Sequence, residues 1–262
     1  MQIEKYFERI KYKGPATACF ELLEELQQQH LLHIPFENLD IHWKIPIELI
    51  TDKIFDKIIN KKRGGFCYEL NGLFHELLMT LGFETRLISA RVYDRNTKEF
   101  GREYDHLAII VRMEENEWLA DAGFGEFSFS PLRIVMDEIQ CDKRGNFRIT
   151  KQGQDSLVVS KASGDEWVPE YIFTLRDRHL SEFEEMCRYQ QVSPESHFTR
   201  NRVCSVLTKN GNRRITITDN KMKFTDINGT KEIPISDDAE FGKLLWKYFK
   251  IKKELSGIAA MR

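Results

Sequence analysis

A cysteine preceded by two glycines is the first feature of this sequence that could do chemistry. Cys67 lies in the segment RGGFCYELN, residues 63–71, where the glycines permit a sharp turn and a helix is expected to begin. Unpaired N–H groups in the first turn of a helix favour a thiolate, and Arg63 adds a positive charge nearby. We therefore expect the pKa of the Cys67 thiol to be lowered, as suits a nucleophile; a small core residue is the alternative.

A nucleophilic thiol needs a base, and His106 is the best candidate because it opens the apolar run HLAIIVRM, residues 106–113. This run predicts a strand, whose end holds a side chain rigidly toward a cleft. Asp105 is a poor partner for the imidazole, since neighbours on a strand point to opposite faces. Asp121 lies in the apolar run WLADAGFG, where an unpaired carboxylate is costly. We expect it to orient His106; a turn-forming aspartate is the alternative.

The elements that would position these residues change type along the chain. Up to about residue 84 the pattern is mainly helical, and it then becomes strand-like, as in a small antiparallel sheet or barrel. Helices are expected at 17–28, 67–81 and 181–190, with a terminal helix that carries Phe241, Leu244, Leu245 and Tyr248 on one face. Strands are expected at 85–93, 106–113, 117–122, 157–160, 171–175, 203–208 and 213–218, the last two joined by a turn at Asn210-Gly211.

Composition narrows the class of protein. The chain has 262 residues, of which 41% are apolar, and a net charge of −2 from 39 basic and 41 acidic residues. This balance argues against a nucleic-acid-binding or membrane-surface protein. The five cysteines show no C-x-x-C spacing, and residues 1–10 contain no apolar signal region. We expect a reduced, cytoplasmic protein without disulfides or a transmembrane segment.

Three motifs together resemble a known family. RGGFCYELN, then DHLAIIV, then WLADAGFG are similar in order and spacing to the signature of arylamine N-acetyltransferases. IPFENLD at 34–40, YQQVSP at 189–194 and CSVLT at 204–208 also resemble segments of that family, so the likeness covers essentially the whole chain. It implies an α+β fold in three domains: a helical bundle at 1–84 with the catalytic cysteine, a β-barrel at 85–178 with the histidine and aspartate, and an α/β lid at 179–262. The first two are similar to the core of transglutaminases and papain-like proteases.

The resemblance also implies an activity. Cys67 would take acetyl from acetyl-CoA as a thioester and pass it to an arylamine, aryl hydrazine or N-hydroxyarylamine in a ping-pong cycle, with a role in xenobiotic metabolism. By similarity, Phe124 contacts the acceptor, with Phe127 and Phe129 close by; ordinary core positions are the alternative for the latter two. An ion pair between Glu37 and Arg63 behind the site is expected by analogy. For CoA the resemblance points to Arg102, Glu103, Tyr189, Ser196, His197 and Phe198.

Two other readings use the same residues. The triad could serve a cysteine hydrolase or a transglutaminase-like enzyme with water or lysine as acceptor, or the chain could be an idle relative that binds CoA or aromatic ligands. The intact triad argues against the idle relative, and the aromatic segment after Asp121 favours the transferase over the hydrolase. We expect no metal site, because His30 and His33 have no third ligand, and no permanently bound cofactor. The sequence leaves the preferred amine and the oligomeric state open.

Overall fold

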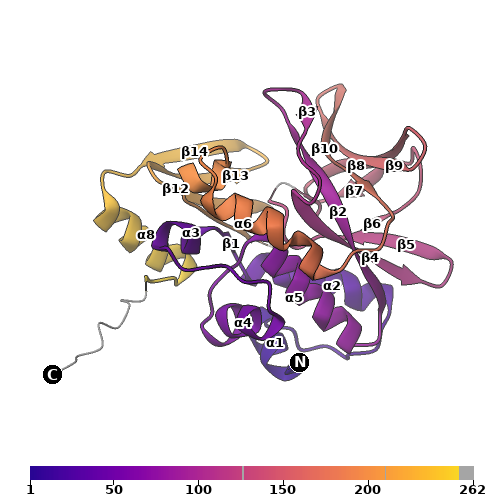
Figure 1. The fold of residues 1–262 in the computed structure, drawn as a ribbon, viewed down its shortest axis with the longest axis horizontal. Coiled ribbons are helices and arrows are strands. Elements are labelled where there is room, and N and C mark those ends of the chain that lie inside the picture. The colour runs from indigo at the N-terminus through magenta and orange to yellow at the C-terminus, as the bar shows by residue number, and fades with distance from the viewer. Residues whose placement is uncertain (126, 210, 254–262) are drawn as a thin grey trace.

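The chain forms a layer of helices beside a large antiparallel sheet, and a second, smaller sheet lies toward its carboxyl-terminal end (Figure 1). This computed structural model describes residues 1–125, 127–209 and 211–253. The expected α+β class is confirmed by the separate helical and antiparallel regions. No helix in the described ranges is long and apolar enough to cross a membrane.

Helices dominate the amino-terminal third, and α5 (Cys67–Thr80) runs through its centre. Leu70, Leu73, Phe74 and Leu77 of α5 are fully buried, as their spacing of three and four residues requires. The helix stops before Gly82, whose φ of 88° is accessible mainly to glycine. The other helical elements here are α1 (Ile3–Ile10), α2 (Phe20–His33), α3 (Leu39–Trp43), α4 (Thr51–Phe55) and the π-helical turn η1 (Asp56–Asn60).

The large sheet is entirely antiparallel and curls around its own apolar core, which includes Ile88, Leu119, Phe147 and Tyr171. Its strands follow the order β6-β5-β4-β2-β10-β9-β8-β7, and β3 pairs with β2. Their bounds are β2 (Glu84–Asp94), β3 (Glu99–Phe100), β4 (His106–Met113), β5 (Asn116–Ala120), β6 (Leu132–Arg133), β7 (Gln140–Asp142), β8 (Gly145–Gln152), β9 (Ser156–Ser163) and β10 (Glu166–Thr174). The predicted hairpin of β4 and β5 is confirmed.

The smaller sheet combines segments from both ends of the chain. β1 (Phe36–Glu37) pairs with β11 (Val203–Thr208), and the order is β1-β11-β12-β13-β14. The remaining strands are β12 (Arg213–Thr218), β13 (Lys221–Asp226) and β14 (Gly229–Pro234). α8 (Asp238–Phe249) packs on this sheet, while η2 (Leu180–Phe183), α6 (Glu184–Val192) and α7 (His197–Arg200) connect it to the large one.

Several elements differ from the sequence-based expectation. α1 was not expected, although its apolar residues at 3, 6, 7 and 10 have helical spacing. α2 begins at Phe20 and not at Thr17, and the expected helix at 181–190 begins as the 3₁₀ turn η2. The β13–β14 hairpin was also missed, because its alternating charges hide a two-residue turn at Ile227-Asn228, which Gly229 follows as the first residue of β14. Asn210 of the other expected turn lies outside the described residues.

Candidate active site

Cys67 is the first residue of α5, and Phe66 is the residue that caps this helix. The backbone N–H of Phe66 donates to Glu69 Oε2 at 2.8 Å, so the side chain of Glu69 closes the start of the helix. Only 5% of Cys67 is exposed to solvent. The thiol therefore lies at the positive end of a helix, as the sequence predicts, but almost out of contact with water.

The two glycines before Cys67 allow the loop to approach the segment at Pro35 closely. A Cβ atom on Gly64 would lie 2.1 Å from the carbonyl oxygen of Pro35, a distance that no side chain can adopt. The backbone N–H of Gly65 donates to the same oxygen at 3.2 Å, and Glu37 N–H donates to Gly65 O at 2.8 Å. The loop that presents Cys67 is thus fixed to β1 by its own backbone.

His106 and Asp121 lie side by side in the interior. His106 Nε2–H donates to Asp121 Oδ2 at 2.7 Å, and the two residues are 2% and 0% exposed. His106 begins β4, whereas Asp121 follows directly after β5, so the hairpin joins them. Asp105 does not contact the imidazole by a described hydrogen bond; its Oδ1 instead accepts from Gln190 Nε2 at 2.8 Å.

The carboxylate of Asp121 is surrounded by hydrogen-bond donors. Such a set offsets the cost of burying a carboxylate and fixes its orientation. Asn71, one helical turn after Cys67, also donates to Leu107 O at 2.6 Å and accepts from Ala122 N–H at 2.7 Å, which links α5 to the hairpin. Besides His106, the donors to Asp121 are Asn71 Nδ2 at 2.8 Å, Gly123 N at 2.9 Å, Phe124 N at 3.0 Å and Tyr171 Oη at 3.2 Å.

Gly123 brings the loop after Asp121 directly against Cys67. A Cβ atom on Gly123 would lie 3.0 Å from both Cα and the carbonyl oxygen of Cys67, and 2.9 Å from Asn71 Nδ2. Cys67 and the Asp121 loop are therefore in van der Waals contact through backbone atoms. The structure thus brings together all three residues of the predicted triad around this contact.

The expected lowering of the Cys67 pKa is wrong for the resting thiol. Burial raises the pKa of Cys67, the negative charges of Asp105 and Asp121 act in the same direction, and the backbone N–H of Tyr68 opposes them. Arg63 cannot help in the way the sequence suggested, because its guanidinium pairs with Glu37 at 2.6 Å. This pair was expected by analogy and is present. The resting side chain of Cys67 is therefore favoured as the neutral thiol.

Of the three phenylalanines expected near the acceptor, the structure brings only Phe124 to the site. Its ring lies edge-on to the His106 imidazole, with 5.1 Å between centroids. Phe127 stacks on Tyr171 in the core of the large sheet, and Phe129 is buried against Leu31 and Leu207. Phe127 and Phe129 therefore follow the core alternative, because adjacent layers of the fold enclose them.

A small cavity lies next to Phe124, between the loop 122–125 and the smaller sheet. It is lined there by Ser205, Val206 and Leu207, and it has about 10 Å³ of space, enough for about one water molecule. An aromatic ring does not fit this volume.

The six residues expected at CoA divide into two groups. Arg102 and Tyr189 are close together at the surface: the guanidinium lies 4.4 Å from the ring centroid, and both side chains contact the Glu195 carboxylate. Glu103 pairs with Arg178 at 3.1 Å, and His197 is exposed.

Ser196 and Phe198 have internal contacts. Ser196 Oγ accepts from the backbone N–H of Phe198 and caps α7, and the Phe198 ring packs 4.6 Å from that of Phe66. These two residues support the loop before Cys67 and offer little polar surface to a ligand.

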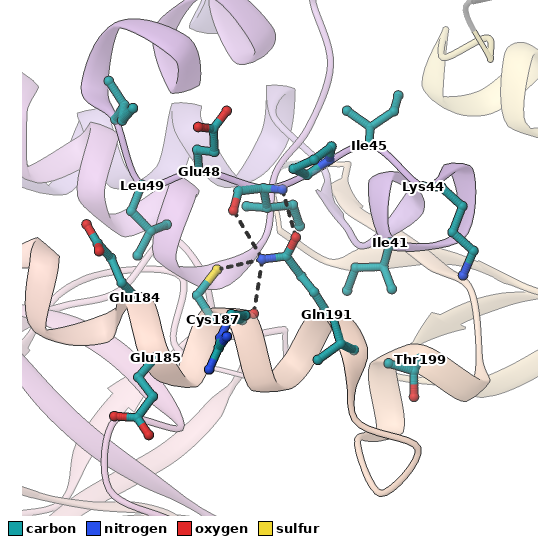
Figure 2. Close-up of a pocket in the computed structure, with 15 residues that line it drawn as sticks. Ile41, Lys44, Ile45, Glu48, Leu49, Glu184, Glu185, Cys187, Gln191 and Thr199 are labelled. Atoms are coloured by element: carbon teal, nitrogen blue, oxygen red, sulfur yellow. Dashed lines mark hydrogen bonds between the residues drawn. The ribbon is translucent and has the colours of Figure 1, made fainter.

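A much larger groove, which Cys67 does not line, lies between residues 44–50 and α6 (Figure 2). Its volume is about 1150 Å³, and the amide of Gln191 bridges it by bonding the backbone of Ile47 and of Cys187. Burial raises the pKa of Cys187 to about 12, and no described histidine bonds its sulfur. Within the described residues, no group of histidine, cysteine and acidic side chains has the arrangement of a metal site.

Sequence reasoning missed the side chains that hold the triad. Asn71 could have been found, since it lies four residues after Cys67 and hence on the same face of α5. Tyr171 and Gln27 gave no signal. Tyr171 arrives on β10, and Gln27 accepts from the backbone N–H of Asp121 at 3.1 Å from α2.

Known proteins share both this sequence and this fold. A profile of an N-acetyltransferase family matches residues 20–258. The pineal gland isozyme NAT-3 of arylamine N-acetyltransferase from Gallus gallus is 32% identical over 96% of this chain and 94% of its own. Arylamine N-acetyltransferase 1 from Homo sapiens is 30% identical over 96% and 94%. The chain belongs to the arylamine N-acetyltransferase family. It is therefore an acyltransferase by family, as the three motifs suggest.

Solved structures of this family agree with the fold. The arylamine N-acetyltransferase of M. smegmatis superposes with a TM-score of 0.90 at 28% identity, over 98% of this chain and 95% of that one. The Mycobacterium marinum enzyme in complex with CoA gives a TM-score of 0.87 at 26% identity, over 95% and 93%. The arylamine N-acetyltransferase fold therefore extends over essentially the whole described chain.

Proposed function

We propose that this arylamine N-acetyltransferase transfers acetyl from acetyl-CoA to an aromatic amine, hydrazine or hydroxylamine in two steps through Cys67. The observation that supports this most is the His106–Asp121 hydrogen bond beside the start of α5. A relative of the same fold has been solved with CoA, which supports acetyl-CoA as donor. In this proposal each domain has its own role: residues 1–84 carry the nucleophile, residues 85–178 carry the base and its carboxylate, and residues 179–262 cover the site. Residues 210 and 254–262 of the last domain lie outside the described structure.

In the first step His106 takes the thiol proton of Cys67, and Asp121 stabilises the imidazolium that forms. The thiolate attacks the acetyl carbonyl, the bond from that carbon to the sulfur of CoA breaks, and CoA leaves with the proton from His106. The nearly complete exclusion of Cys67 and His106 from water strengthens their attraction as an ion pair. The raised pKa of the resting thiol is compatible with this step, because the proton moves within the pair.

In the second step the nitrogen of the amine attacks the acetyl carbon on Cys67. His106 removes a proton from that nitrogen, and the carbon–sulfur bond to Cys67 breaks, which restores the thiol. Phe124 lies beside the imidazole and provides an apolar surface for a flat acceptor. The burial of Cys67 and His106 also hinders the approach of water, so the thioester survives until an amine arrives.

Location and role are part of the same proposal. All five cysteines are free in the structure, and Cys67, Cys187 and Cys204 are buried. Such thiols persist in a reducing compartment, so we place the protein in the cytoplasm. Acetylation of foreign aromatic amines is the corresponding metabolic role.

Mass spectrometry tests the proposal. After incubation with acetyl-CoA alone, the peptide that contains Cys67 should carry one acetyl group, and the peptides with Cys19 and Cys141, which are exposed, should not. A later addition of arylamine should remove the acetyl group and release acetylated amine. An unmodified Cys67 peptide would refute the covalent route.

Steady-state kinetics separate the transferase from a hydrolase with the same triad. The transferase should release CoA slowly in water and much faster with an arylamine, and initial rates should give parallel double-reciprocal lines. Truncation of Phe124 to Ala should slow the amine step far more than the acetylation step. Fast CoA release in water that ignores every aromatic amine would favour the hydrolase.

A further inference from the structure

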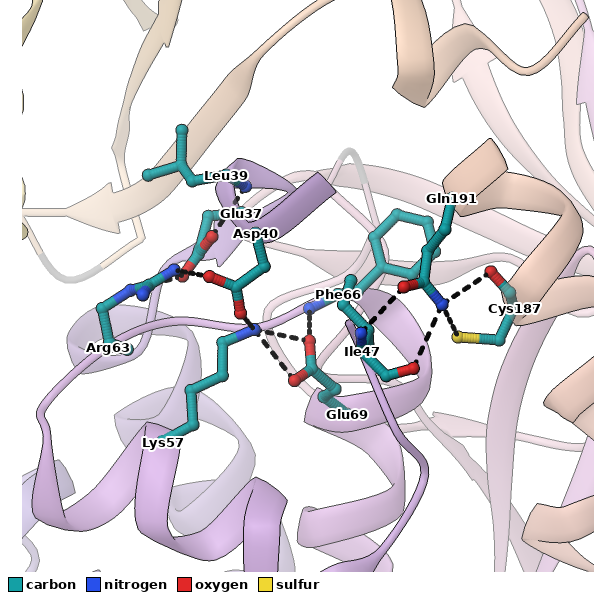
Figure 3. Close-up of polar contacts among 10 residues, drawn as sticks. All are labelled: Glu37, Leu39, Asp40, Ile47, Lys57, Arg63, Phe66, Glu69, Cys187 and Gln191. Atoms are coloured by element: carbon teal, nitrogen blue, oxygen red, sulfur yellow. Dashed lines mark hydrogen bonds and ion pairs between the residues drawn. The ribbon is translucent and has the colours of Figure 1, made fainter. Parts of the chain in front are cut away.

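Lys57 is a buried lysine beside the start of the catalytic helix, and the proposed chemistry does not use it. Its side chain is 13% exposed and lies between two carboxylates, as Figure 3 shows. Nζ is 2.9 Å from each carboxylate oxygen of Glu69 and 2.7 Å from Asp40 Oδ2. These three acceptors match the three donors of an ammonium group, so the charge is fully paired.

Glu69 connects this lysine to the nucleophile. Its Oε2 accepts from the backbone N–H of Phe66, the residue before Cys67, and its side chain is 3% exposed. A carboxylate at this point fixes the first turn of α5, but its negative charge also opposes formation of a thiolate two residues earlier. Lys57 removes that conflict because it balances the charge and leaves the cap in place.

Lys57 comes from an unusual backbone element. It lies in η1, the π-helical turn that continues α4, and one extra residue in such a turn changes the direction of the side chains that follow. π-Helical turns are often found at functional sites. Here the turn delivers the ammonium group of Lys57 into the space between α3 and α5 (Figure 3).

The charges around the start of α5 come from several elements. Behind the helix, the cations Lys57 and Arg63 face the carboxylates of Glu37, Asp40 and Glu69, which leaves one excess negative charge in this cluster. Asp105, Asp121 and the Cys187 thiol are also close enough to act on Cys67, and Asp121 bonds the His106 imidazole. Cys187 itself is close to Glu69 and Lys57. Removal of one cation from this set exposes Cys67 to a second uncompensated carboxylate.

We propose that Lys57 and Glu69 form a positioning pair for Cys67, in which Glu69 fixes the start of the catalytic helix and Lys57 neutralises Glu69 so that the helix terminus keeps its favourable field at the thiol. This inference rests on the proposed role of Cys67 as nucleophile. Neither residue touches the reacting atoms, so both act through the helix.

The pH dependence of Cys67 alkylation measures the influence of Lys57 and Glu69 on the thiol without any substrate. Iodoacetamide is the reagent, and mass spectrometry of the peptide that contains Cys67 gives the rate at each pH. Lys57→Met should shift the midpoint of the alkylation rate against pH upward by about one pH unit, the order of magnitude expected when one nearby charge is lost in a medium of intermediate polarity. Lys57→Arg keeps the charge and should restore most of the shift. In the double variant Lys57→Met/Glu69→Gln both charges are gone and the amide oxygen can still cap Phe66, so the midpoint should return close to that of the wild type.

Lys53→Met is the matched control. Lys53 lies one turn earlier, is 57% exposed and pairs with Glu48 at the surface, so its loss should leave the midpoint unchanged. Glu69→Gln alone should shift the midpoint downward, opposite to Lys57→Met, because it removes the negative charge and keeps the lysine.

The alkylation midpoints of these variants distinguish an electrostatic role of the Lys57–Glu69 pair from a purely structural one. A folded Lys57→Met protein with the wild-type midpoint would overturn the proposal, whatever its melting temperature. If Lys57→Met does not fold, Glu69→Gln decides, and an unshifted or raised midpoint in that variant overturns it. Failure of acetylation at Cys67 in the wild type, by contrast, would refute the proposed function and leave the alkylation result intact.

Discussion

Two buried histidines of this protein, His106 and His30, differ in the hydrogen-bond partner that each has in the interior. Both are almost fully enclosed, and each makes one strong hydrogen bond from its ring. His106 bonds the carboxylate of Asp121, whereas His30 Nδ1 lies 2.8 Å from the phenol oxygen of Tyr6. In the described structure, the second nitrogen of His30 has no hydrogen-bond partner.

The partner decides the chemistry. Burial lowers the pKa of His30 to about 3, and the positive charge of Arg9 acts in the same direction. A phenol offers no negative charge to stabilise an imidazolium, so His30 stays neutral and serves packing between α1, α2 and Phe74 of α5. The carboxylate beside His106 supplies what His30 lacks. Burial alone therefore does not produce a catalytic histidine.

Loss of the imidazole gives the largest expected difference between the two regions. His106→Asn should reduce the rate of acetylation of Cys67 by about 10²–10⁴-fold, because the thiol loses the group that accepts its proton. His30→Gln should keep that rate within about tenfold, since no reacting atom depends on it. Single-turnover release of CoA measures both, with circular dichroism as the control of folding. Equal losses of the acetylation rate in the two variants would contradict different roles for His106 and His30.

Packing around the triad should matter next. Gly123→Ala places a methyl group 3.0 Å from the backbone of Cys67, and the resulting displacement should reduce kcat by about 10²-fold. Gly125→Ala is the matched control two residues later, where the nearest atom is Arg214 Nη1 at 3.7 Å. It should keep nearly full activity. If both alanines are harmless, the backbone contact at Gly123 does not position Cys67.

Acid should destabilise the protein through His30. The pKa of this residue is lowered from 6.5 to about 3 in the folded state, so the unfolded chain binds a proton first as pH falls. Its contribution is complete above pH 6.5 and is lost progressively between that value and about 3. Urea unfolding should show that the wild type loses about 1.4 kcal/mol more per pH unit than His30→Gln between pH 6 and 4. Parallel pH profiles of the two proteins would contradict this.

The hydroxyl of Tyr6 should have the smallest effect. Tyr6→Phe removes the partner of His30 Nδ1 in a fully buried position and should cost about 1–3 kcal/mol of unfolding free energy at pH 7. Activity should not change, since the pair lies outside the site. A variant as stable as the wild type would show that another arrangement satisfies the ring.

The nearness of the three residues of the proposed triad could be predicted from sequence, because each of them is tied to a local signal. Cys67 follows two glycines at a helix start, His106 opens an apolar strand, and Asp121 is an acidic residue within an apolar run. The short hairpin between the strands then fixes which residues meet. Family resemblance added the fold and the reaction, and the arrangement of helices and sheets agrees with it.

The surroundings of the triad could not be predicted in the same way, because they depend on distant segments. Tyr171, fifty residues after Asp121, donates a hydrogen bond to its carboxylate, and Arg63 forms ion pairs with Glu37 and Asp40. The error in the Cys67 pKa has the same origin: the helix terminus is visible in sequence, but burial is not. Phe127 and Phe129 resemble Phe124 in sequence and differ from it only in the layer that covers them.

The pairing of β1 with β11 has a consequence for synthesis of the protein. Phe36 and Glu37 hold the loop of Cys67 through Gly65, and they are themselves held by Ser205 and Cys204, nearly 170 residues later. A ribosome that has passed Asp121 has made all three residues of the proposed triad, but the strand that secures the loop of Cys67 does not yet exist. Non-local pairing of this kind forms late. The newborn enzyme should therefore gain activity only when β11 has left the exit tunnel, however early its catalytic residues were made.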